Sequence, residues 1–204
     1  MEDLDDWRVM LGALCARFRT PDMSAGAEFL RRVVEAANAA NHHPDVQVSY
    51  GHVDVDLTTH DAGGLTMLDV EMARTISAIA AEAGLTASPR ERQVMEYAVD
   101  ALDIDAVRPF WAAVTGLSPD DRGNLPAEGA GVVAVWFQQM DAPRPQRSRI
   151  HLDITVPRDV AEARVAAAVE AGGSLVSDAA APQFWVLADV EGNEVCVCTA
   201  AGRD

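Results

Sequence analysis

The chain has 204 residues, enough for one large domain or two small ones, with 49% hydrophobic and 24% charged residues as in ordinary globular proteins. Its formal net charge is −16 and no basic cluster offsets it, which disfavours nucleic acid and anionic membranes as partners. All 16 basic residues are Arg, so chemistry that needs a Schiff-base lysine or a P-loop lysine is excluded.

The N-terminus, the apolar runs and the cysteines together predict a cytoplasmic protein. The N-terminus, MEDLDDWRV, has no apolar segment of the kind found in signal peptides, and no apolar run approaches the ~20 residues of a membrane span. Cys15, Cys196 and Cys198 are too few for a disulfide framework and suit a reducing compartment.

The first 41 residues are expected to form a hairpin and a helix. Residues 7–20 alternate as two short strands that turn near Gly12. Residues 24–41 show the i, i+4 apolar spacing of a helix, with Ser24 as a candidate N-cap. This helix must end before Pro44, because proline disfavours the helical conformation in the residue that precedes it.

Residues 47–84 are expected to form strands and then a second helix. Apolar and polar residues alternate strictly from 47 to 59, which predicts either a strand pair turning at Gly51-His52 or one long bent strand. The helix is predicted to begin at Thr66, with Asp69 completing an approximate capping box, and to end at Gly84.

A change of pattern after residue 84 predicts two domains. Residues 85–93 are short, polar and contain Pro, so we expect them to link a domain of residues 1–87 to one of residues 92–204. Beyond this linker, an apolar strand, an acidic or Pro-containing turn, a helix and further strands occur twice, starting near residues 94 and 150. The simplest interpretation is a βαβββ unit used twice.

Three histidines in the first half point to chemistry. His42 and His43 are adjacent at the predicted end of the first helix, and His60 lies just before Gly63-Gly64 and a helix start. Imidazoles that converge near a helix N-terminus can bind a metal or transfer protons. A single surface histidine is usually only solvated, but a triplet framed by Pro, Gly-Gly and Asp favours a functional site.

The segment around these histidines resembles the signature of the pterin-4a-carbinolamine dehydratases over roughly residues 7–84. The matching positions are His42-His43-Pro44, Tyr50, Val53, Val55, Leu57, Thr59-His60, Gly64-Leu65-Thr66, Asp69 and, before the first hairpin, Trp7. The resemblance implies an α+β fold, with helices on one face of an antiparallel four-stranded sheet. It also implies elimination of water from a 4a-hydroxytetrahydropterin to give a quinonoid dihydropterin.

The resemblance also implies roles for individual residues. His42 and His60 are expected to perform acid–base catalysis, His43 to hold the pterin, and Asp69 to orient His60. The expected substrate-binding residues are Trp7, Asn38, Tyr50 and Thr59. Asn38 stands where the family usually has Glu, and it cannot carry a negative charge.

The partners expected from the same resemblance are few. The substrate is a small-molecule pterin, and no cofactor is expected. Relatives of this kind assemble as dimers and tetramers, so we expect a homo-oligomer.

Residues 94–200 resemble the glyoxalase-like branch of the vicinal oxygen chelate superfamily. The residues that carry this resemblance are Asp103 to Trp111, Gly116-Leu117, Arg149 to Asp153 and Asp189 to Glu194. Active members usually bind a divalent metal through one residue from each of four strands; those positions here hold Glu96, Gln138 or Gln139, His151 and Cys196, with Glu194 two residues away. Because such a set mixes hard and soft ligands, no metal is expected, and Glu96, His151 and Glu194 are only weak candidates.

Three functional hypotheses remain. The leading one is an active dehydratase fused to a ligand-binding or structural glyoxalase-like domain. The second is a non-catalytic pterin-binding or protein-interaction module. The third places a metal-dependent lyase or dioxygenase in the C-terminal half, and Gln138 and Cys196 argue against it.

Overall fold

The computed structural model describes residues 4–105, 108, 117–120, 122–126, 133–142, 150–170, 173–188 and 194–201, with the side chain of His151 outside this description. The chain divides into two compact units, and each is described by itself. Unit 1 comprises Met1–Gln93, Val156–Val160 and Ala200–Asp204, and unit 2 comprises Val94–Thr155 and Ala161–Thr199. No helix in the described part of the chain is long and apolar enough to cross a membrane.

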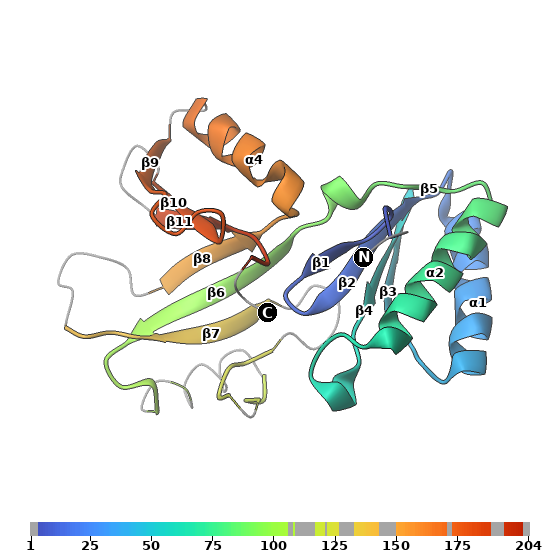
Figure 1. The fold of residues 1–204 in the computed structure, drawn as a ribbon, viewed down its shortest axis with the longest axis horizontal. Coiled ribbons are helices and arrows are strands. Elements are labelled where there is room, and N and C mark those ends of the chain that lie inside the picture. Colours follow the sequence, from blue (N-terminus) through green and yellow to red (C-terminus); the bar gives the residue numbers. More distant parts are fainter. Residues whose placement is uncertain are drawn as a thin grey trace. The chain divides into compact units, whose positions relative to one another are not determined.

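Unit 1 is built on an antiparallel sheet with the strand order β1-β2-β4-β3, and β5 pairs with the end of β2 (Figure 1). The strands are β1 (Arg8–Met10), β2 (Ala13–Arg19), β3 (Asp45–Ser49), β4 (His52–Leu57) and β5 (Thr86–Ala87). The alternating segment 47–59 therefore forms a strand pair, and the α+β fold with a four-stranded antiparallel sheet is confirmed.

Two helices cover the apolar face of this sheet: α1 (Met23–Ala40) and α2 (Met67–Glu82) (Figure 1). Side chains alternate across a strand, so Leu14, Ala16 and Phe18 of β2 share one face. They are fully buried and belong to one core cluster with apolar residues of β4 and of both helices. The other face carries the charged side chains of Arg17 and Arg19 in β2 and of Asp54 and Asp56 in β4, together with Cys15.

The helix ends show which sequence signals were correct. The cap of α1 is Asp22, whose side chain accepts a hydrogen bond from the Ala25 amide at 2.8 Å, so the expected N-cap at Ser24 was wrong by two residues. At the other end, Asn41 adopts the left-handed conformation, with φ of 49°, and closes the helix. The predicted capping box of α2, formed by Thr66 and Asp69, is confirmed.

Within the segment 85–93, predicted as a linker, residues 86–92 form structure that attaches to β2. Strand β5 is followed by the short 3-10 helix η2 (Pro89–Glu91), and the Ser88 amide donates to the Arg17 carbonyl at 2.7 Å. Arg92 then reaches the polar face of the sheet, where it pairs with Asp54 at 3.2 Å and with Asp56 at 2.6 Å. Arg17 completes this ion network through two 2.6 Å contacts to Asp54.

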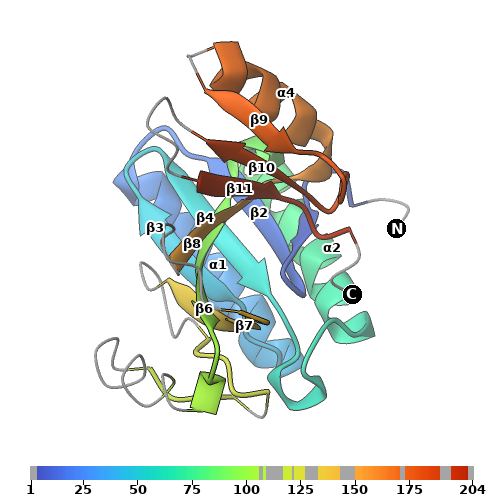
Figure 2. The same cartoon turned by 90° about the vertical axis from the view of Figure 1, so that its left-hand side faces the viewer.

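Unit 2 is built on a six-stranded mixed sheet in the order β7-β6-β8-β11-β10-β9; Figure 2 shows β8, β11, β10 and β9 in sequence along it. The strands are β6 (Val94–Ala101), β7 (Ala134–Gln139), β8 (Ile150–Thr155), β9 (Ser174–Ser177), β10 (Phe184–Ala188) and β11 (Glu194–Cys198), with helix α4 (Arg158–Glu170) after β8.

The pairing in unit 2 has the internal symmetry predicted from the repeated pattern. Strands β6 and β8 pair antiparallel, β7 runs parallel to β6, and β11 runs parallel to β8. Each half therefore pairs its first strand with a later parallel strand, which is consistent with a glyoxalase-like fold. The helix predicted in the first repeat falls on residues 110–116, which lie outside the described residues.

Replacing Arg92 by Met tests whether the ion network holds residues 86–92 on the sheet. The guanidinium is nearly buried and its loss leaves Asp56 unpaired, so we expect about 2 kcal/mol lower unfolding free energy after allowing for the partial exposure of Asp56. Urea unfolding and hydrogen exchange at the Ser88 amide measure the change.

Arg31→Met provides the control, because the pairs that Arg31 forms in the described structure are with the exposed Glu28 and Glu35 of α1. It should leave the urea midpoint and the Ser88 exchange rate almost unchanged. Equal effects of the two substitutions would contradict an anchoring role for Arg92.

Candidate functional site

The three histidines of the predicted site come from two loops of unit 1. His42 and His43 directly follow Asn41, which caps α1, and His60 begins the 3-10 helix η1 (His60–Ala62) after β4. His42 is buried, with 8% of its surface exposed, whereas His43 and His60 are exposed. The histidines therefore differ in their environment as well as in their origin.

A buried carboxylate joins the two loops. Asp69, in the first turn of α2, is fully buried and contacts His42 Nε2 through Oδ1 at 2.8 Å. Its Oδ2 atom accepts from the Thr59 hydroxyl at 2.7 Å and from the Thr66 amide at 2.7 Å. We call these four residues, Asp69, His42, Thr59 and Thr66, the Asp69 network.

The positions of the hydrogens in the Asp69 network follow from chemistry. An ionised carboxylate can only accept, so the 2.7 Å contact requires the hydrogen of the Thr59 hydroxyl. The 2.8 Å contact between the two threonine hydroxyls then uses the Thr66 hydrogen. By the same reasoning His42 donates through Nε2–H, so its other ring nitrogen, Nδ1, carries no hydrogen and has no partner among the described residues.

The pKa of Asp69 supports its ionised state. Burial alone would raise this pKa, but the Thr66 amide, the Thr59 hydroxyl and His42 all donate to the carboxylate. Together these donors hold the pKa of Asp69 below its ordinary value, because hydrogen bonds to the charged form favour that form. The side chain is therefore a carboxylate at neutral pH.

His43 has a different kind of partner. Its Nε2 atom lies 3.0 Å from Oδ1 of Asn38, an exposed residue in the last turns of α1. The partner of His43 is thus an uncharged amide, whereas the partner of His42 is a buried carboxylate. Each of the two adjacent imidazoles is therefore held at its own Nε2 atom, His42 by a charged carboxylate and His43 by a neutral amide.

His60 belongs to a loop that its own backbone closes. The Thr59 amide donates to the Gly64 carbonyl at 3.1 Å, and the Ala62 amide donates to the Thr59 carbonyl at 3.1 Å. The expectation that Asp69 orients His60 stays a prediction. In the described structure Asp69 bonds to His42, and it reaches the His60 loop only through Thr59.

The remaining residues assigned by resemblance lie outside the Asp69 network. Trp7 is 3% exposed, donates from Nε1 to the Ser77 hydroxyl at 3.0 Å and packs edge-on against Phe18, which makes it a core residue. Tyr50 is 76% exposed in the turn between β3 and β4. Pterin contact by these two residues stays a prediction.

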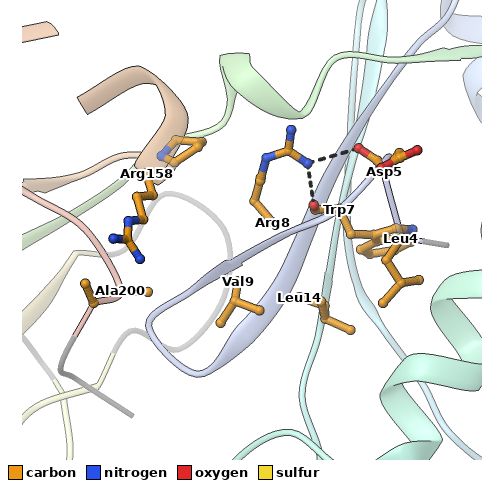
Figure 3. Close-up of a pocket in the computed structure, with 10 residues that line it drawn as sticks. Leu4, Asp5, Trp7, Arg8, Val9, Leu14, Arg158 and Ala200 are labelled. Carbon is orange, nitrogen blue, oxygen red and sulfur yellow. Dashed lines mark hydrogen bonds between the residues drawn. The ribbon is translucent and has the colours of Figure 1, made fainter. Parts of the chain in front are cut away.

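A cavity of about 440 Å³ in unit 1 is distinct from the histidine site. Leu4, Trp7, Val9 and Leu14 contribute to its lining (Figure 3). The Arg8 guanidinium, also at this cavity, donates to the backbone carbonyls of Asp5 and Trp7 at 3.0 and 2.7 Å (Figure 3). None of the three site histidines lines the cavity.

The candidate metal ligands of unit 2 come from neighbouring strands of its sheet. Glu96 of β6 lies opposite Asp153 of β8, and Asp153 lies opposite Cys196 of β11. Gln139 uses its amide to donate to the Leu102 and Met140 carbonyls at 2.9 Å each. Within the described residues, no group of three His, Cys, Asp or Glu could hold a metal ion; the side chain of His151 lies outside them.

Sequence reasoning missed one member of the site. Thr66 was predicted as the start of α2 and as a motif position but not as a site residue, yet its amide and hydroxyl both belong to the Asp69 network. The capping-box spacing from Thr66 to Asp69 was the signal that could have placed it there.

Known families match both halves of the chain. The family described as pterin 4 alpha carbinolamine dehydratase matches residues 1–79, and the one described as glyoxalase-like domain matches residues 96–198. A relative from Cyanothece sp., provisionally named pterin-4-alpha-carbinolamine dehydratase, is 45% identical over 74 residues, covering 36% of this chain and 76% of the relative. Another from Nostoc punctiforme, with the same name, is 45% identical over 76 residues, covering 37% and 82%.

Two solved structures are also similar. A transcriptional coactivator/pterin dehydratase from Brucella melitensis shares 36% identity over 37% of this chain and 83% of its own, with a TM-score of 0.36. A glyoxalase/bleomycin resistance protein/dioxygenase superfamily member from Vibrio splendidus shares 16% identity over 53% of this chain and 99% of its own, with a TM-score of 0.35. The family matches confirm both resemblances stated from the motifs.

Asp69→Asn should destabilise unit 1 in a pH-dependent way. In the asparagine, an NH₂ group replaces one carboxylate oxygen, so a donor faces the donors that surround Asp69. We expect this to lower the unfolding free energy by about 2–3 kcal/mol at neutral pH. Because the folded pKa of Asp69 is lowered, the carboxylate stabilises fully above its unfolded pKa of about 4, and this contribution is lost as pH falls through the folded value.

Urea unfolding at pH 7 and pH 3 measures this change. The difference between the native protein and Asp69→Asn should be large at pH 7 and smaller at pH 3. Asp61→Asn, which alters an exposed carboxylate in η1, serves as control and should change little at either pH. A difference that is independent of pH would show that ionised Asp69 does not stabilise the fold.

Proposed function

The chain belongs to the pterin 4 alpha carbinolamine dehydratase family over residues 1–79 and to the glyoxalase-like domain family over residues 96–198, and we propose that unit 1 dehydrates a 4a-hydroxytetrahydropterin. The observation that carries this proposal is the pairing of buried His42 with the Asp69 carboxylate, together with the link from that carboxylate to the loop of His60.

The proposed reaction needs one acid and one base. The C4a–O bond of the substrate breaks, a proton reaches the departing hydroxyl to give water, and the N5 proton leaves to give the quinonoid dihydropterin. The net proton count does not change, so two imidazoles of opposite protonation state can perform both transfers in one turnover.

The partners of the histidines support separate roles. Asp69 stabilises the positive charge that His42 gains on accepting a proton at its free Nδ1 atom, so we assign His42 as the base for the N5 proton. His60, exposed and without a carboxylate partner in the described structure, is assigned as the acid for the hydroxyl. His43, tied to Asn38, is assigned to hold the pterin.

Alanine replacement of His42 or of His60 should each reduce turnover by at least ~100-fold, because each removes one of the two proton-transfer groups. The assay uses synthetic 4a-hydroxytetrahydropterin in a stopped format, with the full-length chain. Turnover near the native rate in either variant would contradict the assignment of that histidine.

His52→Ala provides a matched control, since His52 lies at the start of β4 and its Nε2 atom is 3.9 Å from Asp54 on the polar face of the sheet, away from Asp69. This variant should retain native turnover. The assay is also run with a chelator, and turnover that persists supports proton transfer by histidines without a metal. Turnover lost with chelator, or absent from the native chain, would overturn the proposal.

A further inference from the structure

The two histidines assigned to proton transfer are far apart in the chain and belong to separate loops. His42 follows α1, whereas His60 follows β4, and in the described structure no hydrogen bond joins them directly. Proton transfer to both ends of one small substrate requires a fixed distance between the two imidazoles. Some contact must therefore hold the His60 loop in place relative to His42.

Thr59 makes that contact. Its hydroxyl donates to Asp69 Oδ2 at 2.7 Å, and Asp69 Oδ1 accepts from His42 at 2.8 Å. The chain of contacts from the residue before His60 to the His42 ring therefore passes through a single carboxylate. That carboxylate is fully buried, so water does not compete for its hydrogen bonds.

The hydroxyl of Thr59 is not available to donate to a substrate. A threonine hydroxyl has one hydrogen, and Asp69 takes it. The oxygen also accepts from the Thr66 hydroxyl at 2.8 Å. This use of the hydroxyl argues against the pterin-binding role predicted for Thr59 and favours a role in positioning.

Fixing Thr59 also fixes the segment that carries His60. Thr59 and Gly64 form a backbone bridge, and the amides of Ala62 and Gly63 donate to the carbonyls of Thr59 and His60. The six residues from Thr59 to Gly64 are thus held as one closed loop. In the described structure, the Thr59 hydroxyl is the side-chain group that ties this closed loop to the carboxylate of Asp69.

We propose that Thr59 is a positioning residue, which sets the His60 loop against His42 through the shared carboxylate of Asp69. This inference rests on the proposed dehydratase function and adds to it the group that sets the geometry between acid and base. It assigns Thr59 no contact with the reacting atoms. Its removal should therefore affect turnover more than substrate binding.

The test compares Thr59→Val with Thr58→Val in the full-length chain. Both changes replace a threonine by the similarly shaped valine, but the Thr58 hydroxyl donates to the Gly12 carbonyl at 3.3 Å, away from Asp69. We expect Thr59→Val to lower kcat about 10- to 100-fold with KM changed by less than about threefold. Thr58→Val should retain native values, and Thr59→Ser, which keeps the hydroxyl, should restore most of kcat.

A second measurement does not depend on activity. Hydrogen exchange at the Thr59 and Ala62 amides reports opening of the His60 loop, and it should speed up at least about tenfold in Thr59→Val but not in Thr58→Val. If the native chain has no dehydratase activity, the proposed function fails while the exchange result still decides the positioning role. Unchanged exchange in Thr59→Val, native kcat in that variant, or equal losses in Thr58→Val would overturn the inference.

Discussion

The buried carboxylate of Asp69 is the constraint on which the histidine site depends. An ionised carboxylate taken fully out of water is very costly unless donors surround it, and here the donors come from three different elements. His42 follows α1, Thr59 follows β4, and Thr66 caps α2. The charge can be accommodated only when these three chain segments meet, so the contacts that stabilise the fold also link the segments that carry His42 and His60. The capping box of α2, normally a local device for starting a helix, takes part in the same arrangement.

The central sheet of unit 1 uses its two faces for different purposes. One face is apolar and packs under α1 and α2, whereas the other carries the ion network of Arg17, Asp54, Asp56 and Arg92. Burying carboxylates on that second face requires guanidinium partners, and one of them comes from the segment after α2. Residues 86–92 therefore attach to the sheet, although their polar composition and proline suggested a linker. Short polar segments are predicted as linkers because their composition does not reveal which distant charges they pair with.

The sequence predicted the parts of the site that depend on local pattern. Thr66 and Asp69 are three residues apart, and the capping box between them follows from that spacing alone. The partner of Asp69 could not be predicted in the same way. His60 lies closer to Asp69 along the chain than His42 does. In the folded chain, however, the end of α1 meets the start of α2, so Asp69 bonds to His42. The cap of α1 shows the same limit at short range, since Asp22 and Ser24 both suit an N-cap and only the backbone path selects Asp22.

The contacts also show which histidine is affected by Asn38. Its side chain lies against His43, while His42 is paired with Asp69 and His60 stands in a separate loop. The absence of a negative charge at residue 38 therefore acts first on the imidazole assigned to hold the pterin. The two imidazoles assigned to proton transfer keep their arrangement through Asp69 and Thr59, neither of which Asn38 contacts in the described structure. Because the two sets of contacts are separate, replacement of the usual Glu by Asn is compatible with the proposed chemistry, and its effect should fall on substrate binding before it falls on proton transfer.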